Sequence, residues 1–140
     1  MASPLRARLG FVALALGTIA VGLAVHWRGT LLPATLRDLL GDALWAMMIA
    51  WWIGALAPNT RLTSRAGLAL AICWIVEFSQ LYHAPLVDGW RLTTPGQLIL
   101  GTGFDVRDLG AYAFGVLVTL ILELTMRHRQ PSTSAAPLGR

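Results

Sequence analysis

The sequence contains no lysine and a single cysteine, so every basic side chain other than histidine is an arginine. With Cys73 alone, a disulfide within the chain is excluded, and no Cys/His pattern of a zinc site accompanies it. Charged residues make up 13% of the chain, about half of the usual share in soluble proteins. A chain of 140 residues cannot hide a composition that is 56% hydrophobic from water, so lipid must surround part of it.

Other signals of function are missing as well. There is no phosphate loop, nucleotide fingerprint or nucleophile motif, and we therefore expect no cofactor. A net charge of +4 does not require nucleic acid as a partner, because arginines at the ends of membrane segments set orientation and contact lipid phosphates. We expect membrane lipids as partners and no nucleic acid.

Four long apolar segments dominate the sequence, at 9–27, 39–57, 66–82 and 109–126. A hydrocarbon core of about 30 Å needs roughly 20 helical residues, and each segment approaches this length once its end turns are added. The sequence therefore predicts an all-α, polytopic membrane protein with a four-helix transmembrane bundle. The first apolar run is longer than the roughly 7–15 residues of a signal peptide's core, which favours an uncleaved anchor.

Local signals mark the ends of these segments. Residues 35–38 have the spacing of a capping box and predict the start of the second helix. A short helix at 94–100, too brief to span, is expected to lie in the interface or to re-enter the membrane between the third and fourth spanning helices. Residues 105–108 predict the cap of the fourth. We expect one membrane domain over 1–130 and a disordered tail over 131–140.

The arginines predict the orientation. Both termini and the 58–65 loop form the side with more arginines. This places both termini in the cytoplasm and the other two loops on the outer side of a bacterial inner membrane. Trp27, Tyr82 and Trp90 would then belong to the aromatic belt of the outer boundary. The richer side holds Arg6, Arg8, Arg61, Arg65, Arg127, Arg129 and Arg140, and the other side holds Arg28, Arg37, Arg91 and Arg107.

In this orientation, polar residues from three helices fall at one depth. Asp42, Glu77, Asp108 and Tyr112 all lie within roughly 5–10 Å of the outer boundary. Glu77 and Gln80 share one helix face, since they are three residues apart. A polar stripe on the fourth segment likewise has to face the bundle interior rather than lipid; it consists of Asp105, Asp108, Tyr112, Gly115 and Thr119. Gly115 would let a neighbouring helix approach closely.

Each of these acidic residues has a structural alternative. Asp105 and Asp108 would serve as cap residues of the fourth helix, and Asp42 would interact with the dipole of the second. Glu77 would form an ion pair with Arg91 or Arg107, or share a proton with another carboxylate.

The remaining histidine, glutamate and cysteine residues indicate no further site. No spacing supports a metal site built from His26 and His83 with Asp42 and Glu77. Glu123 is expected to form a surface pair with Arg127, because the two are four residues apart. Cys73 is expected to pack in an apolar helix.

The ordered motifs resemble a known family. Residues 41–45, 77–82, 100–104 and 108–115 are similar to motifs of the small bacterial membrane proteins of the domain-of-unknown-function 2809 family. More distantly, the pattern resembles the VanZ-like group. This resemblance implies an envelope-facing membrane protein and leaves a role in envelope or antibiotic tolerance open. The recurring residues of that group would be Asp42, Glu77, Gln80, Arg91, Asp108 and Gly115.

The leading prediction is an outward-facing polar pocket that binds a lipid or envelope-precursor head group, or an envelope-active drug. The loop at 85–104 would form its lid, because a long connection in a small domain is more often functional than idle. The predicted binding residues are Asp42, Glu77, Gln80, Arg91, Asp108 and Tyr112. One alternative is a membrane enzyme that acts on a lipid through its carboxylates as acid, base or Mg²⁺ ligands. The other is a small proton-linked carrier or an assembly subunit, which would need homo-oligomers.

Overall fold

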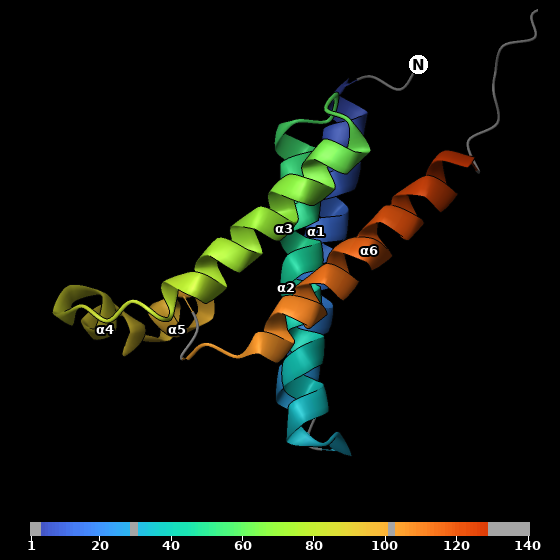
Figure 1. Ribbon diagram of the computed structural model, residues 1–140. Coiled ribbons are helices and arrows are strands. Elements are labelled where there is room, and N and C mark those ends of the chain that lie inside the picture. Colours follow the sequence, from blue (N-terminus) through green and yellow to red (C-terminus); the bar gives the residue numbers. More distant parts are fainter. Residues whose placement is uncertain (1–3, 29–30, 101–102, 129–140) are drawn as a thin grey trace, which may run out of the picture.

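A computed structural model describes residues 4–28, 31–100 and 103–128, and their regular structure is entirely helical. Four helices are long and apolar enough to cross a membrane, so the predicted all-α, four-span architecture is confirmed (Figure 1). The expected tail at 131–140 lies outside the described residues. The spanning helices are α1 (Pro4–Arg28), α2 (Ala34–Leu56), α3 (Leu62–Ser79) and α6 (Val106–His128), and the short ones are α4 (Pro85–Arg91) and α5 (Thr94–Leu100).

The starts of two spanning helices test the capping predictions. Helix α6 begins where expected, because the Oδ1 atom of Asp105 accepts a hydrogen bond of 2.9 Å from the backbone N–H of Arg107. The predicted capping box of α2 is wrong. That helix already begins at Ala34, after Pro33, and has no side-chain cap. Thr35 therefore lies inside the first turn, where its hydroxyl cannot serve as the cap.

The connection between α3 and α6 contains two short helices where the sequence predicted one. Helix α5 occupies the predicted range, and α4 precedes it with Pro85 in its first turn, a position that proline favours. The two pack tightly, since a Cβ atom at Gly96 would lie 1.9 Å from the carbonyl oxygen of Trp90. Figure 1 shows α4 and α5 projecting sideways from the end of α3.

Helix α2 is the centre of the bundle and packs against α1, α3 and α6. Small residues permit this packing, as is usual where helices meet in a membrane. A Cβ atom at Gly115 would lie only 2.2 Å from the carbonyl oxygen of Ala43, so the predicted close approach at Gly115 is confirmed. Cys73 is a buried packing residue, as expected; the core consists of Ala46, Ala50, Ala69, Cys73, Tyr112 and Val116.

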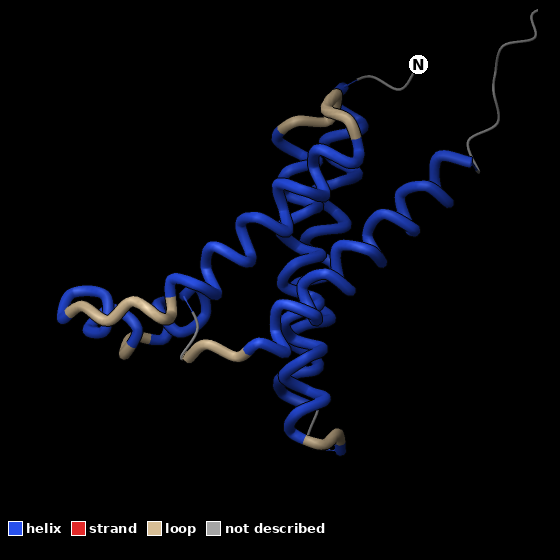
Figure 2. The backbone as a smooth tube through the Cα atoms, in the orientation of Figure 1, coloured by secondary structure: helices blue, strands red, loops and turns tan. Residues whose placement is uncertain are grey.

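The start of α1 and the end of α6 lie at the same end of the bundle (Figure 2). Near this end, Arg65 forms a buried ion pair with Glu123, their side chains being 3% and 6% exposed. The guanidinium of Arg65 also lies 4.8 Å above the ring centre of Phe11. Glu123 pairs with Arg127 at 2.7 Å as predicted, but it is a buried residue between two arginines rather than part of a surface pair.

Candidate functional site

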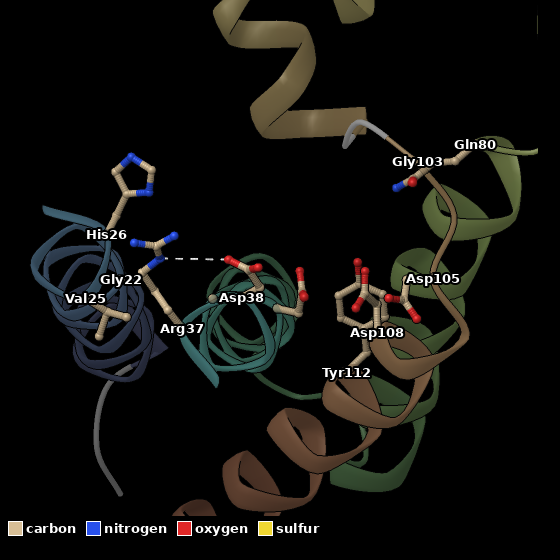
Figure 3. Close-up of a pocket in the computed structure, with 12 residues that line it drawn as sticks. Gly22, Val25, His26, Arg37, Asp38, Gln80, Gly103, Asp105, Asp108 and Tyr112 are labelled. Carbon is tan, nitrogen blue, oxygen red and sulfur yellow. Dashed lines mark ion pairs between the residues drawn. The ribbon is translucent and has the colours of Figure 1, made fainter. Parts of the chain in front are cut away.

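The opposite end of the bundle contains a pocket. The end of α1, the start of α2, the end of α3 and the start of α6 surround a space of about 540 Å³ (Figure 3), which lies within the usual range of small-ligand sites. Residues of α1, α2 and α6 line it, together with Gln80 directly after α3. Its polar side chains are those of His26, Arg37, Asp38, Asp42, Gln80, Asp105, Asp108 and Tyr112.

Glu77 lies behind the pocket wall and is fully buried. Its Oε1 atom accepts a hydrogen bond of 2.8 Å from the backbone N–H of Asp105, and its Oε2 atom accepts bonds from the Tyr112 hydroxyl at 3.1 Å and from Gln80 Nε2 at 3.2 Å. Three neutral donors thus satisfy the carboxylate, which is the usual condition for burying one. Glu77 thereby connects the end of α3 to the start of α6.

The alternative role of Glu77, an ion pair with Arg91 or Arg107, is not found. No arginine among the described residues pairs with it. Arg107 pairs with Asp105 at 2.7 Å, and Arg91 donates to the backbone carbonyls of Ser79 and Tyr82 at 2.7 and 2.9 Å. Arg91 therefore satisfies carbonyl groups at the end of α3, where a cation is favourable for the helix dipole.

Gln80 connects Glu77 to the pocket. Its side chain is buried, with an exposed fraction of 6%, and its Nε2 atom donates to Glu77. Its Oε1 atom is buried and has no hydrogen-bond partner among the described residues. Because the amide nitrogen is bound to Glu77, the amide oxygen remains as an acceptor without a donor at the pocket wall.

Carboxyl groups from two helices meet in the pocket. Those of Asp42 on α2 and Asp108 on α6 lie within hydrogen-bonding range of each other. Asp105 lies just before α6, and its hydrogen bonds with the Arg107 side chain and backbone lower the pKa of its carboxyl group. Among the described residues, no group of three or more His, Cys, Asp and Glu side chains has the arrangement of a metal site.

The basic side of the pocket comes from residues that the sequence prediction left out of the site. Figure 3 shows His26 and Arg37 on one side and Asp105, Asp108 and Tyr112 on the other. The Nε atom of Arg37 lies 3.9 Å from the Oδ1 atom of Asp38. Helical spacing could have indicated Asp38, which precedes Asp42 by four residues and shares its helix face, but it gives no such signal for Arg37.

Two predicted parts of the site lie elsewhere. Arg91 does not line the pocket, and Gly103 is the one described residue of 85–104 that does. Helices α4 and α5 extend from the end of α3, away from α1 and α2 (Figure 1), so the expected lid over the pocket is wrong. The contacts of Arg91 explain this position, because they hold α4 against the end of α3.

Comparison with known proteins gives a family and no structural relative. A family model described as "Protein of unknown function (DUF2809)" matches residues 31–116, and no solved structure matches the chain. The matched range runs from the start of α2 into the middle of α6, and it includes all six predicted binding residues. The wider VanZ-like relation stays a prediction.

Proposed function

The chain belongs to the DUF2809 family, and we propose that it binds the polar head group of a membrane lipid, or of a lipid-linked envelope precursor, at the outer face of a bacterial inner membrane. The observation that carries this proposal is the pocket of about 540 Å³, which is lined by polar side chains at one end of four membrane-spanning helices.

The depth of the pocket fits a head group. At about 1.5 Å per residue, Asp42 lies about 12 Å from the start of α2, and Tyr112 lies about 9 Å from the start of α6. The lining thus extends from the helix ends to just below them, where the head group and glycerol region of a lipid is expected. Trp27 and Trp90 are exposed near the same end of the bundle, as residues of an aromatic interface belt would be.

The arginine distribution supports the placement of the pocket at the outer face of the membrane. The pocket is lined by the end of α1 and by the starts of α2 and α6, so it lies away from the start of α1 and the end of α6. The termini and the 58–65 loop carry the greater number of arginines, which favours the cytoplasm for that side and the envelope for the pocket.

The proposal is tested by locating a bound lipid. The purified protein is placed in vesicles that contain a phospholipid with a photoreactive group in its head group, and the cross-linked peptides are identified by mass spectrometry. We expect cross-links in the first turns of α2 and α6. Cross-links confined to the lipid-exposed faces of the helices, or to the opposite end of the bundle, would contradict a head-group site in this pocket.

A further inference from the structure

We infer that the pocket recognises a head group that carries a primary ammonium beside a phosphate, with the ammonium held at the Asp42–Asp108–Gln80 wall and the phosphate held by Arg37 and His26. This inference rests on the proposed function and adds the chemical class of the ligand. A phosphoethanolamine head group on a membrane lipid has this chemistry.

The hydrogen-bond donors near Glu77 indicate where an ammonium group would bind. The hydroxyl of Tyr112, the backbone N–H of Asp105 and Nε2 of Gln80 are all donated to Glu77. The acceptors that remain are the carboxyl groups of Asp42 and Asp108, which line the pocket, and Oε1 of Gln80, which is buried and has no hydrogen-bond partner among the described residues. A ligand has to bring the donors, and a primary ammonium brings three together with a positive charge.

The unpartnered amide oxygen of Gln80 is the observation that points to a ligand. It belongs to a side chain that is 6% exposed, and leaving such an acceptor without a donor destabilises the folded protein. The hydrogen bond from Gln80 Nε2 to Glu77 fixes the direction of the amide. Exchanging the amide oxygen and nitrogen would break this bond, so it does not provide a donor for the oxygen. An N–H donor in the pocket would satisfy it.

Two carboxyl groups in the pocket lining indicate that the ligand carries a positive charge. Asp42 and Asp108 both line the pocket, and two neighbouring carboxylates repel when both are ionised. An ammonium that contacts both carboxylates removes this repulsion. An organic cation fits better than a metal ion, because no group of three or more potential ligands among the described residues has the arrangement of a metal site.

Arg37 and His26 form the part of the pocket that would bind the phosphate of the head group. Both line the side of the pocket opposite Asp105, Asp108 and Tyr112 (Figure 3), and the guanidinium of Arg37 can present two parallel N–H donors to a phosphate. Four carboxylate residues line the pocket against Arg37 and His26. A head group with a phosphate alone would meet this excess of negative charge, whereas a zwitterionic one matches both sides.

The test compares head groups on the full-length protein. Purified protein in detergent is given equal amounts of phosphatidylethanolamine, phosphatidylcholine and phosphatidylglycerol with the same acyl chains, and native mass spectrometry records which lipid remains bound. We expect phosphatidylethanolamine to exceed each of the others by at least about tenfold, the size of one charge-assisted hydrogen bond.

The alternative results separate this inference from the proposed function. A preference for phosphatidylglycerol would overturn the inference and leave a head-group site in place. Equal binding of phosphatidylcholine would also overturn it, because a choline group has charge without N–H donors. Retention of none of the three lipids would count against both the inference and the proposed function.

Charge-neutral variants locate the recognition within the pocket. Asp108→Asn should reduce the preference for phosphatidylethanolamine over phosphatidylglycerol by about tenfold. Its control is Asp88→Asn, which removes the same charge outside the pocket. Arg37→Gln should weaken the binding of both lipids equally. Arg61→Gln, at the other end of the bundle, should weaken the binding of neither. An unchanged preference in Asp108→Asn would contradict the assigned ammonium position.

Discussion

Glu77 is a buried carboxylate without a cationic partner among the described residues, and it organises the wall of the pocket. The sequence predicted that Glu77 and Gln80 share a face and that Tyr112 lies at the same depth, because helical spacing determines both. It did not predict the donors. The backbone N–H of Asp105 comes from the turn before α6, and only the folded chain brings this turn to the end of α3.

The role of Glu77 is tested by Glu77→Gln. The new amide group would face the donors of Tyr112 and Gln80, so we expect the Gln80 amide to rotate and turn its nitrogen toward the pocket. Binding of an ammonium head group should fall by at least about tenfold, and the variant should remain folded with a loss of about 1–3 kcal/mol in the free energy of unfolding.

Two measurements check this variant, namely lipid retention by native mass spectrometry and thermal unfolding in detergent. Retention equal to that of the wild type would show that the orientation of Gln80 does not matter for binding. Loss of folded protein would show that Glu77 acts through the connection of α3 to α6 alone.

Asp105 provides a test by pH. Its hydrogen bonds to Arg107 lower the pKa of its carboxyl group, so the ionised form stabilises the folded state. This contribution is present above the ordinary aspartate pKa of about 3.9, and it disappears as the pH falls through that value to the lower pKa of the folded state. We expect Asp105→Asn to lower the melting temperature at neutral pH and to have no effect at strongly acidic pH.

The control for Asp105 is the same substitution in an Arg107→Gln background. The melting difference should be much smaller there at every pH, because the interacting guanidinium is gone. A difference that keeps its size in that background would assign the effect to the cap of α6 rather than to the pair of side chains.

At the scale of the elements, the sequence predicted the four spans well because continuous apolar runs mark them. It missed α4, whose seven residues are too few to show a helical period and whose position depends on the tertiary contacts of Arg91. It also assigned Arg65 to the orientation count alone. Its burial against Glu123 follows from how α1, α3 and α6 pack together, which no local pattern shows.

The contact of α2 with α6 is tested by a matched pair of glycines on α6. A Cβ atom at Gly115 would meet the carbonyl oxygen of Ala43 at 2.2 Å, whereas one at Gly110 has nothing within 4 Å. We expect Gly115→Ala to reduce the free energy of unfolding by about 1–3 kcal/mol and to separate Asp108 from Asp42. Gly110→Ala should leave stability equal or raise it by up to about 1 kcal/mol. Thermal unfolding of both variants in detergent checks this, and equal melting temperatures would contradict the close approach.

At the scale of the whole molecule, the proposed orientation places the pocket at the outer face of the membrane. A lone cysteine at Thr94 or at Ser64, each in a Cys73→Ala background, reports the side of the membrane. We expect a membrane-impermeant thiol reagent to label intact cells at Thr94 and not at Ser64, because the two residues lie at opposite ends of α3 and its extension. The reverse pattern would place the pocket in the cytoplasm and remove the argument for envelope lipids.

If a head group occupies this pocket, a larger side chain that fills the pocket should displace it. Lipid retention by such a variant is therefore the decisive measurement. Gly41 lines the pocket, whereas Gly67 on α3 does not, and a Cβ atom at either position has nothing within 4 Å. Gly41→Leu and Gly67→Leu thus make the same change, one inside the pocket and one outside it. Native mass spectrometry of lipid carried through purification should show a loss in Gly41→Leu and wild-type retention in Gly67→Leu. Equal retention in both variants would contradict the claim.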